Sequence, residues 1–149
     1  MGDLRTSKSV AIEARREDVW KTLTTPELIK HWFFGVDTQT DWRVGSRLVH
    51  RGTWQGKPYE DKGEIVQFDA PHRFVHTHWS AMLGQPDEPT NYQQVTWDLS
   101  ERDGVTTLTV TEENLPTEQA RLISEQAWDT VLGNLKEMLE QPDNLRKTA

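Results

Sequence analysis

The chain has 149 residues, a length that suits one domain (residues 1–149) with a sizeable core. Its formal net charge of −7 argues against nucleic-acid binding, and its lack of cysteine excludes disulfides and thiolate chemistry. No apolar run approaches the ~20 residues of a membrane span, and Met1–Ser9 lacks the apolar centre of a signal peptide. We therefore expect a cytoplasmic protein that is not inserted in a membrane.

The N-terminal part is typical of a strand followed by two short helices. Apolar and polar residues alternate from Ser7 to Ala14, as they do in a half-buried strand. From Glu17 to Leu23 the period becomes helical, although the preceding arginines offer no capping oxygen. A second helix is predicted to begin at Thr25, whose hydroxyl would cap it ahead of Pro26, and to end at Gly35.

The middle of the chain shows no helical period between residues 36 and 113. Short turns separate apolar, alternating segments there, which predicts antiparallel strands. These strands are expected at Thr38–Trp42, Arg47–Trp54, Tyr59–Phe68, Arg73–Ser80, Tyr92–Ser100 and Val105–Glu113. A polar loop is expected at Gly84–Asn91, between the strands Arg73–Ser80 and Tyr92–Ser100.

The strand over residues 73–80 has two possible inward faces. One choice turns Val75, Thr77 and Trp79 toward the core. The other turns Phe74, His76 and His78 inward. The alternation alone does not decide between them.

A long amphipathic helix is predicted from Thr117 to Gln141. Its apolar positions recur every three or four residues and comprise Ala127, Trp128, Val131, Leu132, Leu135, Met138 and Leu139. Thr117 supplies a start signal and Pro142 a stop signal, while Ser124 offers an alternative second start. Strands and helices segregated along the chain indicate an α+β fold, with a sheet folded around this helix.

Four segments resemble a known family. Val19–Gly35, with the sequence VWKTLTTPELIKHWFFG, resembles the opening motif of the activator of heat shock protein 90 ATPase homologue family. Gly63–Trp79, Val95–Val110 and Trp128–Lys136 are similar to its later segments in the same order. The family belongs to the START-like, or SRPBCC, superfamily.

This resemblance implies a helix-grip fold, in which a curved antiparallel sheet wraps around the long C-terminal helix. It also implies a cavity between sheet and helix. Members of the superfamily bind lipids, sterols, polyketides or plant hormones, and some catalyse cyclisation or hydrolysis. We expect no cofactor.

Aromatic side chains and one histidine are the candidate ligand-binding residues. The set is His50, Trp54, Trp79, Trp97, Trp128 and Leu132. Inward tryptophans would either wall a ligand cavity or fill the core, and the sequence favours neither. His50 is also the candidate general base, although we favour the interpretation of a histidine satisfied by a neighbouring backbone group.

Two other polar clusters are interpreted as non-functional. His76 and His78 share a strand face and offer two metal ligands, but no third ligand stands out, so we predict no metal site and place both on the outer face of an edge strand. Glu60 and Glu64 lie on one face of their strand and Asp61 on the other, and we interpret them as a solvated strand edge.

Three functional hypotheses follow. The first is binding of a small hydrophobic or amphipathic molecule, and the second is a polyketide-cyclase-like or hydrolytic enzyme using His50. The third, a chaperone partner, ranks last because the family's eukaryotic co-chaperones carry an additional N-terminal domain. Exposed aromatic residues would also support a homodimer.

Overall fold

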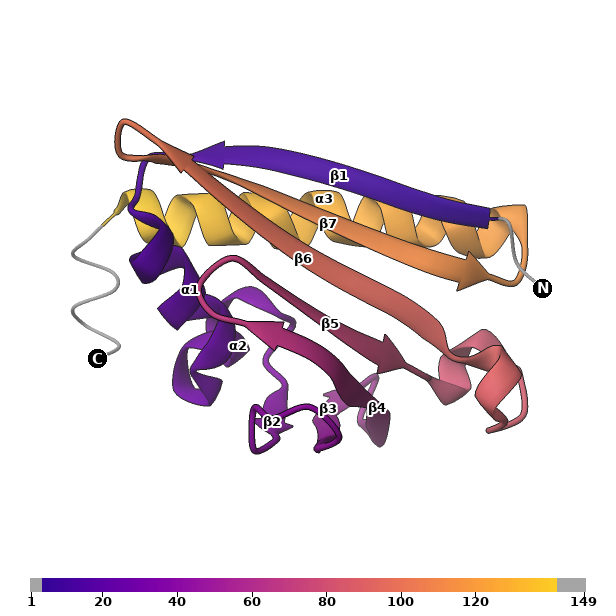
Figure 1. Ribbon diagram of the computed structural model, residues 1–149. Helices are drawn as coiled ribbons and strands as arrows, with labels where there is room; N and C mark the ends of the chain where they lie inside the picture. Colours follow the sequence, from indigo (N-terminus) through magenta and orange to yellow (C-terminus); the bar gives the residue numbers. More distant parts are fainter. Residues whose placement is uncertain (1–3, 142–149) are drawn as a thin grey trace.

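A seven-stranded antiparallel sheet packs against one long helix in the computed structural model, which describes residues 4–141. The strand order is β1-β7-β6-β5-β4-β3-β2. The helices are α1 (Arg16–Thr24), α2 (Pro26–Trp32) and α3 (Glu118–Glu140), with 3-10 turns η1 (Ala81–Leu83) and η2 (Pro89–Asn91). The strands are β1 (Leu4–Ile12), β2 (Asp37–Gln39), β3 (Arg47–Trp54), β4 (Lys57–Asp69), β5 (Arg73–His78), β6 (Gln93–Arg102) and β7 (Val105–Leu115). The predicted α+β helix-grip fold is confirmed (Figure 1).

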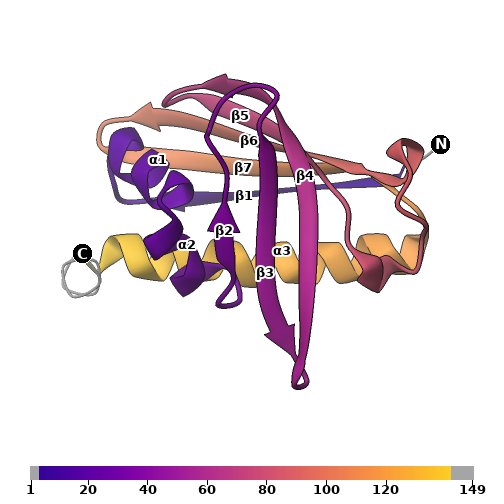
Figure 2. The ribbon, with the colours of Figure 1, turned by 90° about the horizontal axis from the view of Figure 1, so that it is seen from below.

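The sheet curves around α3. Figure 2 shows that β1 and β7 run nearly along the helix, whereas β3 and β4 cross it steeply. A two-residue turn, Gln55-Gly56, joins β3 to β4, and both residues have positive φ (51° and 79°), which suits the twist of a tight hairpin. The turn is shorter than expected, so β4 begins at Lys57 rather than Tyr59.

Strand β4 comes unusually close to β5 at Gly63. A Cβ added at Gly63 would lie 1.7 Å from the carbonyl oxygen of Thr77. The residue before it, Lys62, exchanges two backbone hydrogen bonds with Trp79, at 3.0 and 2.7 Å. The ladder then shifts register between Ile65 and Gln67. Glycine at this position therefore lets the sheet bend inward.

Helix α3 is continuous. The Thr117 hydroxyl accepts a hydrogen bond from the backbone N–H of Ala120 at 3.0 Å, which confirms the predicted cap. The helix does not restart at Ser124, and the predicted stop at Pro142 lies outside the described residues. None of the helices within residues 4–141 is long and apolar enough to cross a membrane.

The two short helices begin differently from the prediction. The backbone N–H of Arg16 donates to the Glu101 carboxylate of β6 at 2.9 Å, so a residue distant in sequence caps α1. The predicted Thr25 cap of α2 is wrong. The Thr25 hydroxyl instead donates back to the carbonyl of Lys21 at 2.6 Å, in the last turn of α1.

Strand β1 is held by parts of the chain that are distant in sequence. It pairs with β7 along its whole length, and Ser7 lies opposite Thr111. From α3, Lys136 donates to the Ala11 carbonyl at 2.7 Å, and the Glu140 carboxylate accepts from the Glu13 N–H at 2.9 Å. These contacts fasten β1 to both the sheet and the helix.

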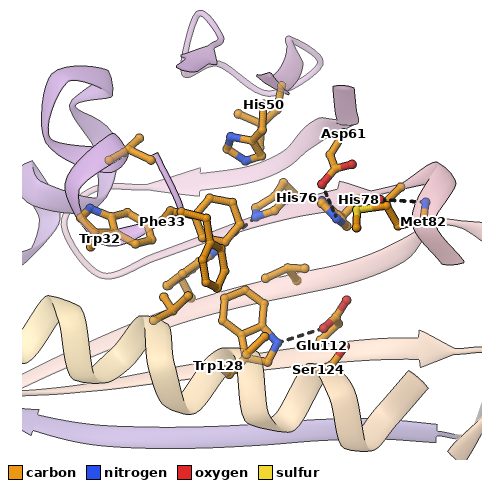
Figure 3. A pocket seen from close by; sticks show the side chains of 18 of the residues that line it. Trp32, Phe33, His50, Asp61, His76, His78, Met82, Glu112, Ser124 and Trp128 are labelled. Atoms are coloured by element: carbon orange, nitrogen blue, oxygen red, sulfur yellow. Dashed lines mark hydrogen bonds and ion pairs between the residues drawn. The ribbon is translucent and has the colours of Figure 1, made fainter. Parts of the chain in front are cut away.

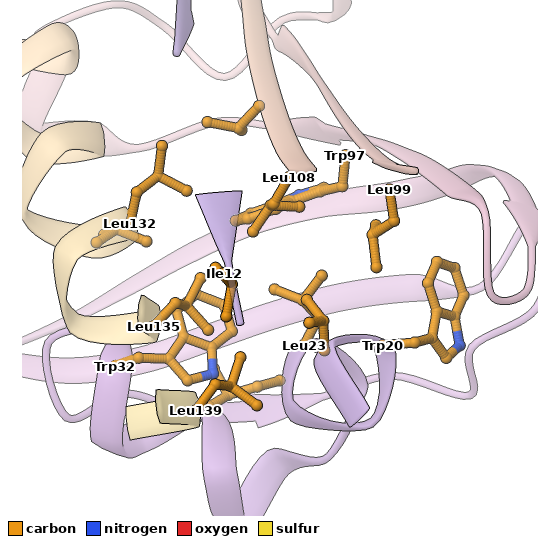
Figure 4. Packing of buried hydrophobic residues seen from close by; sticks show 14 of the residues in the cluster. Ile12, Trp20, Leu23, Trp32, Trp97, Leu99, Leu108, Leu132, Leu135 and Leu139 are labelled. Atoms are coloured by element: carbon orange, nitrogen blue, oxygen red, sulfur yellow. The ribbon is translucent and has the colours of Figure 1, made fainter. Parts of the chain in front are cut away.

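The hydrophobic core fills one end of the fold (Figure 4). There α1 and α2 pack against the C-terminal half of α3 and the adjoining strands. Ile12, Leu108 and Leu135 are fully buried, and the Trp32 indole donates to the Thr22 carbonyl at 3.0 Å. Leu132 belongs to this cluster. The N-terminal half of α3 faces a different environment, described next.

Candidate functional site

A pocket of about 520 Å³ lies between the inner face of the sheet and α3 (Figure 3). It adjoins the core, with which it shares Trp32 and Trp97, and is lined by side chains from α1, α2, β3–β7, η1 and α3. Its lining includes four apolar side chains more than half exposed, namely Phe34, Trp54, Met82 and Ile123. We call this volume the central pocket.

Aromatic rings form the apolar wall of the central pocket. Phe74 stacks on Trp97, with ring centroids 5.8 Å apart and planes 6° from parallel. Trp128 and Trp32 each meet Trp97 edge to face, with centroids at 5.4 and 5.9 Å. Such mutual packing fixes the ring orientations, so the wall is rigid.

His76 is a fixed, neutral imidazole behind this wall. The Trp97 indole N–H donates to its Nε2 at 3.1 Å, and its Nδ1 lies 2.9 Å from the carbonyl oxygen of Thr77. Since a carbonyl only accepts, Nδ1 carries the proton and Nε2 is the acceptor. Burial lowers the pKa of His76 to about 4. The hydrogen bond to the Thr77 carbonyl acts in the opposite direction, and the nearby His78 adds to the lowering. His76 therefore organises the wall and has no free nitrogen for a ligand.

Replacing Trp97 with phenylalanine should test this arrangement. The change keeps a ring but removes the donor to His76, leaving a buried acceptor unpaired, and we expect a loss of about 1–3 kcal/mol in unfolding free energy. Urea denaturation would measure it. The exposed Trp54→Phe is the matched control, with an expected change within about 0.5 kcal/mol. Equal effects of the two substitutions would contradict this role for the hydrogen bond.

His50 turns into the pocket from β3, as the alternation predicts. Its Nδ1 lies 2.9 Å from the Thr38 hydroxyl, and its ring meets Phe33 edge to face at 5.1 Å. Burial, and to a smaller extent repulsion from His78 and His76, lowers its pKa to about 3. Its Nε2 makes no hydrogen bond to a residue that the structure describes.

Asp61 lies directly opposite His50 across the β3–β4 ladder. Its Oδ2 is 3.8 Å from Nε2 of His78, and its Oδ1 is buried with no hydrogen-bond partner among residues 4–141. Burial raises the pKa of Asp61, and the Ser80 hydroxyl opposes this shift. Burial also lowers the pKa of His78 to about 4, so the pair is not an ion pair at neutral pH.

Glu112 is a second buried carboxylate in the pocket. The Trp128 indole donates to its Oε1 at 2.9 Å (Figure 3). Burial raises the pKa of Glu112, whereas hydrogen bonds from Trp128 and Ser124 act in the opposite direction. Figure 3 shows Asp61, His78, Glu112 and Ser124 toward one side and Trp32 and Phe33 toward the other, so the pocket is amphipathic.

The predicted ligand-binding residues divide into two groups. His50, Trp54, Trp97 and Trp128 line the pocket, whereas Trp79 and Leu132 do not. Leu132 packs in the core. Trp79 stacks on Tyr92 with centroids 6.4 Å apart, lies under the Lys62 ammonium at 5.6 Å, and donates to the Pro86 carbonyl at 3.1 Å.

Two further interpretations from the sequence need correction. His76 and His78 do not lie on the outer face of an edge strand, because β5 is central in the sheet and its face with Phe74, His76 and His78 lines the pocket. Asp61 is not part of a solvated edge, because its side chain is only 15% exposed. Glu60 does lie on the outer face, where it pairs with Arg51 at 3.0 Å.

Sequence reasoning missed Glu112, Ser124 and Phe33 as pocket residues. A signal for Glu112 was present, since alternation along β7 places it on the same face as Leu108 and Val110. Within residues 4–141, no group of three histidine or carboxylate side chains has the geometry to hold a metal ion.

Comparisons with known proteins agree with this fold. Residues 13–140 match the model of the family described as Activator of Hsp90 ATPase homolog 1-like protein. No curated protein sequence matches the chain.

Several solved structures are similar to this chain over most of its length. The solution structure of ChR145 from Cytophaga hutchinsonii is 38% identical, with a TM-score of 0.82, and the match covers 95% of this chain and 97% of that chain. The solution structure of the Aha1 dimer from Colwellia psychrerythraea is 18% identical, with a TM-score of 0.73 and coverage of 92% and 96%. DynU16, a protein from the dynemicin biosynthetic locus, is 20% identical with a TM-score of 0.77, and the match covers 94% of this chain and 48% of that chain. Because the family model spans most of its length, the chain belongs to the family of Activator of Hsp90 ATPase homolog 1-like proteins.

Proposed function

We propose that the central pocket binds a small amphipathic molecule. The observation that carries this proposal is an open volume of about 520 Å³ behind a rigid aromatic wall. Pockets for small molecules are commonly of this size, with apolar walls and a few polar groups that orient the ligand. The apolar body of the ligand would lie against Trp97 and Trp128, and its polar group would lie near Asp61 and His78.

The comparisons support this proposal at the level of the fold. The helix-grip fold of START-like proteins is a ligand-binding architecture, and DynU16 shares it. That protein comes from a biosynthetic locus, which is compatible with a fold that handles small organic molecules.

Catalysis by His50 has less support. With a pKa lowered to about 3, His50 is neutral at physiological pH but is a weak base. An imidazole of this kind suits hydrogen bonding to a ligand better than proton abstraction from it.

Filling the pocket should abolish binding. Ala127 lines the pocket from α3, so Ala127→Trp would place a large ring in the volume that the ligand needs. We expect the affinity for the neutral dye Nile red, measured by fluorescence titration, to fall at least ten-fold.

The neighbouring Gln126→Trp is the control for this experiment. Gln126 is exposed and lies outside the pocket lining, so its replacement adds the same ring without filling the pocket. Equal dye affinity in all three proteins, or no dye binding to the native protein, would contradict the proposed function. Native mass spectrometry of freshly purified protein would show in parallel whether a molecule from the host co-purifies.

A further inference from the structure

The central pocket carries negative charge without a fixed positive charge. Among the described residues, no lysine or arginine lines it, whereas Asp61 and Glu112 both do. The three histidines in the lining have pKa values lowered to about 3 for His50 and about 4 for His76 and His78, so they are uncharged at neutral pH. A ligand therefore meets only carboxylates as charged groups.

One oxygen of the Asp61 carboxylate lacks a hydrogen-bond donor. Its Oδ1 is shielded from solvent and receives no hydrogen bond within residues 4–141. The nearest imidazole, that of His78, is 3.8 Å from Oδ2, which is too long for a hydrogen bond. Glu112 differs, because the Trp128 indole donates to it at 2.9 Å. The Ser80 hydroxyl bonds to the Asp61 carboxylate but leaves Oδ1 without a donor. A buried carboxylate oxygen without a donor is costly, and a donor from a ligand would remove that cost.

His50 offers a second polar group on the same surface. Its side chain is 8% exposed, it lies opposite Asp61 across the hairpin, and its Nε2 has no described hydrogen-bond partner. The Asp61 carboxylate and the His50 imidazole, from adjacent strands, thus face the pocket together.

We infer that the central pocket selects a hydrophobic amine, whose ammonium group pairs with the Asp61 carboxylate while its apolar body lies against Trp97 and Trp128. This inference rests on the proposed ligand-binding function and names the class of its ligand. The same geometry disfavours fatty acids and other carboxylates. An anionic head group would be desolvated beside two carboxylates with no cation to receive it.

Three probes with one ring system and different head groups would test the inference. Naphthylmethylamine is cationic, naphthylmethanol is neutral, and naphthoate is anionic. Isothermal titration calorimetry at pH 7 should show that the amine binds at least ten-fold more tightly than the alcohol and the naphthoate. In Asp61→Asn, which is nearly isosteric, the affinity for the amine should fall to that for the alcohol, whose own affinity should change less than three-fold.

Glu60→Gln is the matched control. It removes the same charge from the adjacent position on the outer face of β4, so the preference for the amine should remain. Equal or tighter binding of naphthoate or the alcohol would overturn the inference while leaving the proposed function intact. Survival of the amine preference in Asp61→Asn, or its loss in Glu60→Gln, would also overturn the assignment to Asp61. If none of the three probes binds, the proposed function itself fails and the inference falls with it.

Discussion

Replacing Gly63 with alanine is expected to destabilise the protein by about 3 kcal/mol or more. The new methyl group would lie 1.7 Å from the carbonyl oxygen of Thr77, and this obstacle is backbone that no rotamer change can move aside. Strand β4 would have to separate from β5 between the Lys62–Trp79 bridge and the Ile65–His76 pair. Since a domain of this size is stable by about 5–15 kcal/mol, urea denaturation should show a clear decrease in midpoint.

Gly133→Ala is the matched control for this substitution. Gly133 lies exposed in the middle of α3, and a Cβ there would meet nothing within 4 Å. Alanine should stabilise the helix by about 0.5–1 kcal/mol. The same glycine-to-alanine change should therefore lower the free energy of unfolding at Gly63 and raise it at Gly133. A neutral or stabilising Gly63→Ala would show that the sheet does not need this close approach.

Acidification from pH 7 to pH 5 is expected to cost much of the folding free energy. The folded-state pKa values of His50, His76 and His78 are lowered from 6.5 to about 3, 4 and 4. The unfolded chain therefore takes up protons near pH 6.5 while the folded chain does not. The resulting stabilisation is complete above pH 6.5 and is lost as the pH falls toward the folded pKa values, by roughly 2 kcal/mol per histidine at pH 5.

The two pocket carboxylates act in the opposite direction at lower pH. Burial raises the pKa values of Asp61 and Glu112, so as the pH falls the folded state binds these protons more readily than the unfolded chain does. Guanidinium denaturation at pH 7 and at pH 5 measures the net change in stability, and a histidine variant identifies the share of one imidazole. His78→Gln should reduce the pH dependence by about a third. Equal stability at the two pH values would contradict the neutral, buried state of the histidines.

The fold was predictable because its periodic elements are strongly patterned. The apolar stripe of α3 has a helical period and the Thr117 cap, so both its existence and its start agree with the sequence. Capping of the short helices was not predictable in the same way. The cap of α1 comes from Glu101, and no local pattern around Arg15 reveals a partner on another strand.

The site was only partly predictable. On β3, alternation correctly places His50 in the pocket together with Leu48, whereas Arg47 and Arg51 on the opposite face are exposed and Val49 between them is buried. On β5, alternation failed because Phe74, Val75 and His76 are all buried, so polarity does not distinguish the two faces. Asp61 was misjudged because the charged residues of its strand were interpreted as a solvated edge. It shares a strand face with the fully buried Ile65 and lies opposite His50, so its position follows from the pairing of β4 with β3.

The long-range pairing of β1 has a consequence for biosynthesis. Ser7 and Thr111 are 104 residues apart in sequence, yet their hydroxyls meet at 3.1 Å. Strand β1 leaves the ribosome before β7 and therefore has no sheet partner until β7 emerges. It also lacks its contacts with Lys136 and Glu140 until α3 is complete. Such non-local contacts slow folding and make it largely post-translational. Until β1 is paired, the polar residues Ser7, Lys8 and Ser9 interrupt its apolar surface and oppose its aggregation.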